Sequence, residues 1–152
     1  MLIINENKIE KLPKSILNEI NISMNLINIF YDFEDDYFSN WSFLIFPLFN
    51  ALEGYIKWKL NSLGIEIDKS FYCFSKNKDK YEFNEKVKLL KKHKDTYLTV
   101  EKCYNIYVNY RHRYFHLSFN FLMYDKFTIK NKQKVIEIFI EVYNSIIECE
   151  VK

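Results

Sequence analysis

The arginines of this 152-residue chain are concentrated in one hexapeptide, residues 111–116, which reads RHRYFH. It holds both arginines and two of the three histidines, whereas the other 20 of the 22 basic residues are lysines. A guanidinium is a planar fork that grips phosphate or carboxylate through two hydrogen bonds, and it stays charged when it leaves water. Histidine adds the side chain whose ordinary pKa lies closest to neutrality. The combination suits chemistry at a phosphodiester, although surface arginines and helix-packing histidines would give the same string.

The spacing of these residues limits what they can do together. Arg111 and His116 are five positions apart, which on an ideal helix places them on the order of 140° apart. They converge only if the helix ends between them or the arginine side chain reaches round. His112 and His116 share a helix face and have a spacing seen in zinc sites. No third ligand is evident nearby and no HExxH glutamate lies between them, so we expect no metal site and no cofactor.

A carboxylate at the end of the most apolar stretch is the second candidate. Glu53 follows the apolar run 41–52, and Gly54 comes next. A buried carboxylate is costly without a partner, and a glycine leaves room for another backbone or a large side chain. We therefore expect Glu53 to pair with Arg111 or His116. The alternative is that Glu53 lies at the rim of the fold and reaches solvent.

The chain contains only two glycines and two prolines, too few turn residues for a β-rich domain. We predict an all-α bundle of four to five helices in a single domain, residues 1–152. Apolar spacing predicts helices over 13–32, 41–63, 82–92, 96–114 and 128–149, with a short extended or loop segment within 65–80. The second helix is apolar nearly all round and should be central. Asn40 or its neighbour Ser39 should cap it, Pro47 either kinks it or marks its first turn, and Gly64 ends it.

The charge of the chain and its cysteines limit which partners and which cellular compartment the protein can have. The formal net charge of +2 does not by itself indicate nucleic acid, but residues 76–94 carry eight lysines against three acids. That stretch is either a phosphate-binding surface or a solvated face. The three separated cysteines and the absence of a signal-like N-terminus predict a cytoplasmic protein with reduced thiols. The longest apolar run is too short to span a bilayer, so we expect no membrane association.

Arg111, the polar His112 and His116 form an Arg-x4-His string late in a helix, and residues 47–54 upstream read PLFNALEG. Together these features resemble the HEPN superfamily of ribonucleases. Within it, the chain looks most like the nuclease domain of the RNase LS toxins of bacterial toxin–antitoxin systems. HEPN domains are helical bundles marked by such an Arg–His string, and the toxin subfamily adds an acidic residue on an earlier helix, where Glu53 lies. The resemblance covers the chain from its first predicted helix to its last.

The resemblance implies a metal-independent endoribonuclease in which an RNA 2′-hydroxyl attacks its own phosphodiester, leaving a 2′,3′-cyclic phosphate and a 5′-hydroxyl. It makes His116 the general acid or base and Arg111 the phosphate clamp. Glu53 would orient His116 or hold Arg111. His112 and Arg113 would add substrate contacts. The resemblance also implies RNA as substrate, a homodimer whose two motifs line one cleft, and an antitoxin or inhibitor protein as partner.

Two other classes of function remain open. One is a non-catalytic HEPN-like module that binds RNA or a nucleotide. The other is a helical interaction or regulatory module whose Arg–His cluster pairs with the acidic run at 32–36. The chain departs from the RNase LS toxins, which carry further domains before this one. It also has Arg113, which either substitutes for Arg111 or adds a second phosphate contact.

Overall fold

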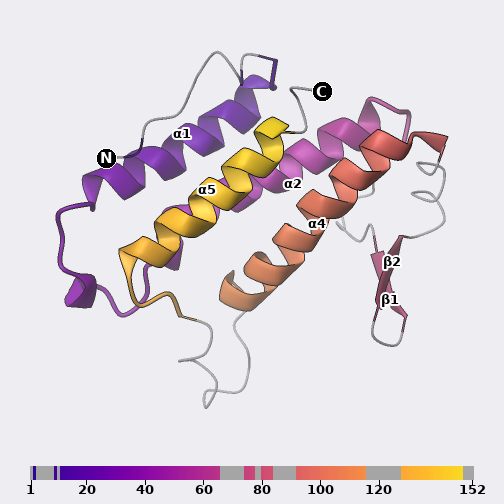
Figure 1. Cartoon of the computed structure of the whole chain (residues 1–152). Coiled ribbons are helices and arrows are strands. Elements are labelled where there is room, and N and C mark those ends of the chain that lie inside the picture. The colour runs from indigo at the N-terminus through magenta and orange to yellow at the C-terminus, as the bar shows by residue number, and fades with distance from the viewer. Residues whose placement is uncertain are drawn as a thin grey trace.

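A computed structural model of the chain describes residues 2, 9, 11–65, 74–77, 80–83, 92–115 and 128–148, and gives only the secondary structure of 74–77, 80–83 and 112–115. In these ranges the α-helices are α1 (Lys14–Ile29), α2 (Phe46–Asn61), α4 (Lys94–Phe115) and α5 (Lys132–Glu148) (Figure 1). Two short 3-10 turns, η2 (Asp35–Tyr37) and η3 (Ser42–Ile45), connect α1 to α2. The strands β1 (Phe74–Asn77) and β2 (Lys80–Phe83) form a hairpin before α4. The helices pack as a bundle, which confirms the predicted all-α class.

Helix α2 is the centre of the bundle, as its apolar residues predict. It packs against α1, α4 and α5, and Figure 1 shows α5 crossing α2 with α1 and α4 on either side. Pro47 stands in the first turn of α2, where its missing N–H costs no helical hydrogen bond. It therefore starts the α-helix rather than kinking it, and the residues just before it form η3. The buried side chains of α2 are Leu48, Phe49, Ala51, Leu52, Tyr55, Ile56 and Leu60.

The two outer helices α1 and α5 each bury one apolar face. The apolar spacing that predicts a helix over 128–149 is that of Val135, Ile138, Phe139, Val142 and Ile146, and all five are buried in α5. In α1 the buried isoleucines are Ile16, Ile20 and Ile27. The predicted helix extended to residue 32, but α1 ends at Ile29, and Tyr31 beyond it is exposed. None of the described helices is both long and apolar enough to cross a membrane.

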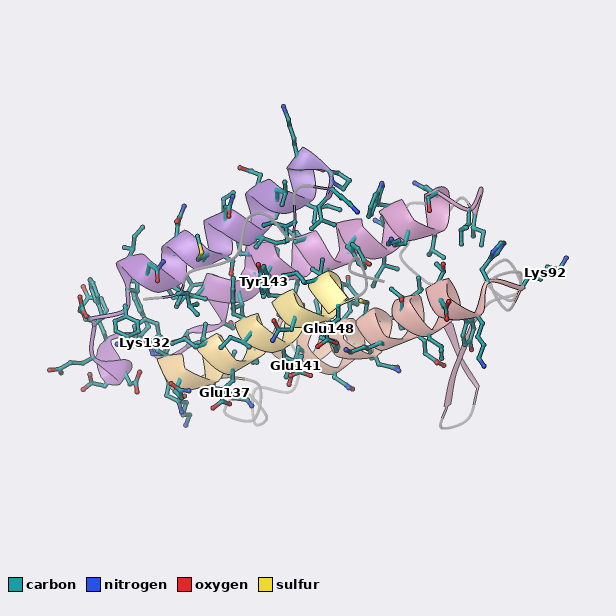
Figure 2. All side chains as sticks on the ribbon, turned by 45° about the horizontal axis from the view of Figure 1, so that its top comes forward. Lys92, Lys132, Glu137, Glu141, Tyr143 and Glu148 are labelled. Carbon is teal, nitrogen blue, oxygen red and sulfur yellow. The ribbon has the colours of Figure 1, made fainter. Side chains whose placement is uncertain are left out.

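Polar contacts also attach α5 to α4. Lys102 Nζ on α4 lies 2.7 Å from Glu148 Oε2 on α5. The hydroxyl of Tyr110 donates to Glu141 Oε2 at 2.6 Å. Both glutamates lie on α5, and Glu148 is its last residue (Figure 2). The pairs are exposed, so their contribution to stability is small and the buried stripe of α5 supplies most of the attachment.

The connection before α2 is hydrogen-bonded to the segment that leads into α5. Asn40 Oδ1 accepts from the N–H of Ser42 at 3.0 Å and from that of Ile129 at 3.1 Å. The backbone N–H of Trp41 donates to the Ile129 carbonyl at 2.8 Å. Trp41 is fully buried, and its indole N–H donates to the Asp35 carbonyl at 2.7 Å. Asn40 thus satisfies an N–H at the start of η3. The predicted capping role is wrong, because the N-cap residues of η3 and α2 are Trp41 and Ile45, and neither helix has a side-chain cap hydrogen bond.

The hairpin before α4 differs from the prediction. Strand β2 pairs antiparallel with β1, with Phe83 opposite Phe74 and Lys80 opposite Asn77. A helix was expected to begin at Glu82, but this residue lies within β2. Tyr81 and Phe83 alternate with Glu82, and aromatic residues at alternate positions favour a strand over a helix. The rest of that predicted helix, residues 84–91, lies outside the described residues.

Gly64 ends α2 in the left-handed conformation, with φ at +71°. Its N–H and that of Ile65 donate to the carbonyls of Asn61 and Leu60 at 2.9 and 3.0 Å, as in a Schellman helix end. A side chain is disfavoured in this conformation, so we expect Gly64→Ala to lower the free energy of unfolding by about 1 kcal/mol. Urea denaturation followed by circular dichroism measures the change.

Gly54→Ala is the matched control for this substitution. A Cβ at position 54 would meet Ile16 Cγ1 of α1 at 3.5 Å, an ordinary van der Waals distance. The side chain of Ile16 thus lies beside Gly54, as expected, but at a distance that a Cβ tolerates. Alanine is the better helix former, so Gly54→Ala should leave stability unchanged or raise it by up to about 1 kcal/mol. Equal losses in both variants would contradict the left-handed requirement at Gly64.

Candidate functional site

The carboxylate of Glu53 on α2 has a different hydrogen-bond donor on each oxygen. Oε1 accepts from Lys57 Nζ at 2.6 Å, one helical turn further along α2. Oε2 accepts from the hydroxyl of Tyr107 on α4 at 2.8 Å. The Glu53 side chain is 22% exposed, so it is largely withdrawn from water but not sealed. The hydrogen-bond partners of this partly buried carboxylate are therefore Lys57 and Tyr107.

The surroundings of Glu53 keep it ionised. Partial burial raises the pKa of Glu53, but the hydrogen bonds from Lys57 and Tyr107 and the charges of Lys57 and Arg111 outweigh it, so the pKa lies below its ordinary value. Burial, and then the hydrogen bond to Glu53 and its charge, raise the pKa of Tyr107 well above its ordinary value. At neutral pH Glu53 thus carries its charge, and Tyr107 keeps the proton that it donates.

Arg111 lies one turn after Tyr107 on α4 and covers its ring. The guanidinium carbon Cζ is 5.2 Å from the centroid of the Tyr107 ring, within cation–π range. Among the described residues no acceptor is recorded for the buried Nε atom of Arg111. A buried guanidinium N–H without an acceptor is uncommon and costly in proteins. Within the described residues, the Nε–H of Arg111 is therefore a donor without an acceptor.

The structure brings two of the predicted site residues into one cluster, which we call the Glu53–Arg111 cluster: Glu53, Lys57, Tyr107 and Arg111. Glu53 and Arg111 are close enough for the arginine to lower the pKa of the carboxyl. They are connected through Tyr107, and the ion pair of Glu53 is with Lys57. His112 and Arg113 belong to α4, but their side chains lie outside the described residues, as does the whole of His116.

Lys57 and Tyr107 were not singled out from the sequence. The available signal was spacing, since Lys57 follows Glu53 by four positions and Tyr107 precedes Arg111 by four. Residues four apart on a helix are neighbours on its surface. The spacing places each residue beside a candidate, but it does not show that the two pairs meet across α2 and α4.

The acidic run at 32–36 contacts the start of α5 through the side chain of Asp35. Asp35 Oδ1 accepts from the backbone N–H of Lys132 at 3.0 Å. Lys132 Nζ donates to the carbonyl of Tyr31 at 2.8 Å and lies 5.5 Å from the centroid of the Trp41 ring. Figure 2 shows Lys132 at the beginning of α5. In the part of the chain that is described, the acidic run is thus engaged with α5 and not with Arg111.

The part of the chain that is described contains no group of three His, Cys, Asp or Glu side chains arranged to hold a metal ion. The chemistry available from the Glu53–Arg111 cluster is that of fixed charge. It holds two cations, Lys57 and Arg111, and one anion, Glu53. The guanidinium is the member with a buried N–H and no described acceptor. An anionic ligand is the chemistry that such a cluster suits.

Comparison with protein-family models gives a match to the RNase LS, bacterial toxin DBD domain over residues 4–118. The chain belongs to this family. The matched residues include all of α1, α2 and α4. They also include the whole Glu53–Arg111 cluster and the hexapeptide 111–116. Helix α5 lies beyond them. A search of curated proteins and a search of solved structures each gave no match. The relation to RNase LS toxins, inferred from Arg111, His116 and Glu53, is thereby confirmed at the level of the family. The match names the DBD domain of these toxins, so the HEPN assignment and the nuclease role stay predictions.

Replacing Glu53 with glutamine is expected to lower the free energy of unfolding by about 1 kcal/mol at neutral pH, because two charge-assisted hydrogen bonds become neutral ones. The native pKa of Glu53 is depressed, so this stabilisation is fully present above the unfolded-state pKa and is lost as pH falls through the native pKa. The difference between wild type and Glu53→Gln should therefore shrink as the solution is acidified. Urea denaturation over a pH series measures it.

Glu141→Gln is the matched control, because Glu141 accepts from Tyr110 as Glu53 accepts from Tyr107, but on an exposed surface. We expect it to change stability less than Glu53→Gln at neutral pH. A deficit in Glu53→Gln that stays constant down to acidic pH would show that the charge of Glu53 does not stabilise the fold.

Proposed function

We propose that this member of the RNase LS toxin family is a metal-independent endoribonuclease with a HEPN-type site. The 2′-oxygen of a ribose forms a bond to the adjacent phosphorus while the bond to the 5′-oxygen breaks. The products are a 2′,3′-cyclic phosphate and a 5′-hydroxyl. The observation that supports this most is Arg111, which is half-buried and whose buried Nε–H has no described hydrogen-bond acceptor.

Each candidate residue has a role in this proposal. Arg111 binds the scissile phosphate with its planar fork and stabilises the charge that develops on the pentacoordinate phosphorus. His116 transfers the proton of the 2′-hydroxyl or of the leaving oxygen, because the ordinary pKa of histidine is near neutral. Glu53 holds Arg111 in place by way of Tyr107. His112 and Arg113 add contacts to neighbouring phosphates.

The proposal extends to the assembly. On a continuous helix Arg111 and His116 would point on the order of 140° apart, so one copy alone would not aim both at one phosphate. A homodimer in which both Arg–His motifs line one cleft would let residues from two chains converge. We also propose a cytoplasmic setting with an antitoxin or inhibitor protein as partner, in keeping with the toxin domain that the family description names.

The experiment is a gel assay of purified protein on single-stranded RNA with EDTA present. We expect cleavage by wild type, with 2′,3′-cyclic phosphate ends, and none by His116→Ala. His93→Ala is the matched control, because His93 is the remaining histidine of the chain and lies exposed before α4. It should cleave as wild type does. Intact RNA in every lane would overturn the catalytic proposal.

The alternative is a non-catalytic HEPN-like module that binds RNA or a nucleotide. The same observation favours it, because the Arg111 guanidinium, whose Nε–H has no described acceptor, would bind phosphate with or without a working histidine. This alternative would be favoured if wild type binds RNA without cleaving it and Arg111→Ala no longer binds RNA. Unchanged stability of Arg111→Ala would show that the loss is one of binding.

A further inference from the structure

We propose that Tyr107 is a positioning residue whose hydroxyl keeps the Glu53 carboxylate from pairing directly with Arg111. The guanidinium thereby stays available to a phosphate group of RNA. This inference rests on the proposed function for the identity of the ligand. It assigns to Tyr107 a role that neither the Arg–His motif nor the family match provides.

The first step is a competition for one carboxylate. A guanidinium and a carboxylate form the strongest ion pair available to side chains. Arg111 is close enough to Glu53 to lower the pKa of the carboxyl. Yet the carboxylate oxygens are taken by Lys57 at 2.6 Å and by Tyr107 at 2.8 Å. To turn toward Arg111, Glu53 would have to give up at least one of these hydrogen bonds.

The second step is the rigidity of Tyr107. Its side chain is 3% exposed, and the ring of Tyr104 stacks on it with the centroids 6.2 Å apart. The ring also supports the guanidinium of Arg111, 5.2 Å from its centroid. A ring with such neighbours has little freedom to rotate. Its hydroxyl is therefore directed at Glu53, and its ring is presented to Arg111, at the same time.

The third step is the charge that this arrangement leaves. Lys57 and Arg111 are cations and Glu53 is an anion, so the cluster carries one net positive charge. Glu53 compensates Lys57 through a direct ion pair. The uncompensated charge is that of Arg111, whose buried Nε has no described acceptor. Without the Tyr107 hydroxyl, Oε2 of Glu53 would lose its donor, and the guanidinium would be the strongest donor within its reach.

The test begins with Tyr107→Phe, which keeps the ring under Arg111 and removes only the hydroxyl. The probe is a 2′-O-methyl RNA oligonucleotide, which lacks the attacking hydroxyl, so binding is measured whether or not the protein cleaves RNA. We expect the Kd from fluorescence anisotropy to rise about tenfold in Tyr107→Phe. The double variant Glu53→Gln, Tyr107→Phe should recover most of this affinity, since glutamine offers the guanidinium no charge.

Tyr110→Phe is the matched control for the loss of a hydroxyl. Tyr110 is on the same helix and also donates to a glutamate, but that glutamate is Glu141 on α5. It should bind the oligonucleotide as wild type does. A merely structural role for Tyr107 would not be reversed by Glu53→Gln. Recovery in the double variant is therefore the decisive result, and its absence would overturn the inference.

A second readout needs no RNA. The chain has only two arginines, so its ¹⁵N spectrum has two arginine Nε–H signals, which Arg113→Lys assigns. In wild type we expect the Arg111 signal to shift when inorganic phosphate is added. In Tyr107→Phe the signal should already be displaced without phosphate and respond less. An Arg111 signal that is the same in both proteins would overturn the inference.

The two proposals fail in different ways. Wild type that cleaves RNA, with Tyr107→Phe indistinguishable from it in affinity and in the Arg111 signal, removes the role of Tyr107 and leaves the nuclease intact. Wild type that cleaves nothing, but shows the loss and recovery of affinity, removes the catalytic proposal and leaves the role of Tyr107 standing.

Discussion

Replacing Arg111 with lysine is expected to reduce kcat for RNA cleavage by about 100-fold, the size of effect seen when one transition-state hydrogen-bond donor is removed. Lysine keeps the positive charge but has neither the planar fork nor the flat face that covers the Tyr107 ring. The loss should therefore exceed what a change of charge alone would give. Initial rates on a fluorescent RNA measure it, beside the affinity for the 2′-O-methyl oligonucleotide.

Arg113→Lys is the control that the sequence supplies. Two positions along an ideal helix amount to about 200° of rotation, so positions 111 and 113 belong to different helix faces. We expect Arg113→Lys to raise KM modestly and to leave kcat close to that of wild type. A loss of kcat in Arg113→Lys as large as that in Arg111→Lys would mean that Arg113 takes the role proposed here for Arg111.

The largest expected effect on stability is that of Trp41→Ala, about 3–5 kcal/mol. Trp41 is fully buried, its indole N–H donates to the Asp35 carbonyl at 2.7 Å, and its ring meets that of Phe38 edge-on, 5.0 Å between centroids. Alanine would leave a cavity where the chain enters α2 and would leave the Asp35 carbonyl without its donor. Urea denaturation followed by far-ultraviolet circular dichroism measures the loss.

Trp58→Ala is the matched control, because Trp58 is the other tryptophan of the chain. It is only partly buried and has Lys59 Nζ 4.9 Å from its ring centroid. We expect its replacement to cost about 1 kcal/mol, as is common for a side chain at the edge of a core. Comparable losses in the two variants would contradict the central place given to Trp41.

The helices could be predicted where periodicity was strong. The buried stripe of α5 and the central position of α2 each follow from apolar spacing, and both are confirmed. Their starts were less predictable, because Pro47 allows either a kink or a first turn and only packing decides between them. Strand β2 was missed because three residues, Tyr81 to Phe83, alternate within a lysine-rich stretch whose composition resembles an exposed helix. A pattern that short does not separate the two periods.

The candidate site was predicted in part. Composition indicated Arg111, and the cost of a carboxylate in an apolar helix indicated Glu53. The structure places both in one cluster. It could not be predicted that Tyr107 joins them, because the Tyr107–Glu53 hydrogen bond connects residues 54 positions apart on two helices. Such a contact depends on how α2 and α4 are rotated against each other, which the hydrophobic pattern fixes only coarsely. The roles of His116, His112 and Arg113 stay predictions.

Helix α5 lies beyond the residues that match the RNase LS toxin family, yet it packs on α1, α2 and α4. In the order of synthesis it is the last of the described helices to be made, after Glu53, Tyr107 and Arg111 have all been added to the chain. Until it arrives, one apolar side of α2 has no cover, and Asn40 and Trp41 lack their contacts with Ile129. Closing contacts this far apart in sequence is a late event in folding. We therefore expect the cluster to become fully ordered only after α5 has been made and has packed on the bundle, so that the activity proposed for this cluster depends on a helix outside the family match.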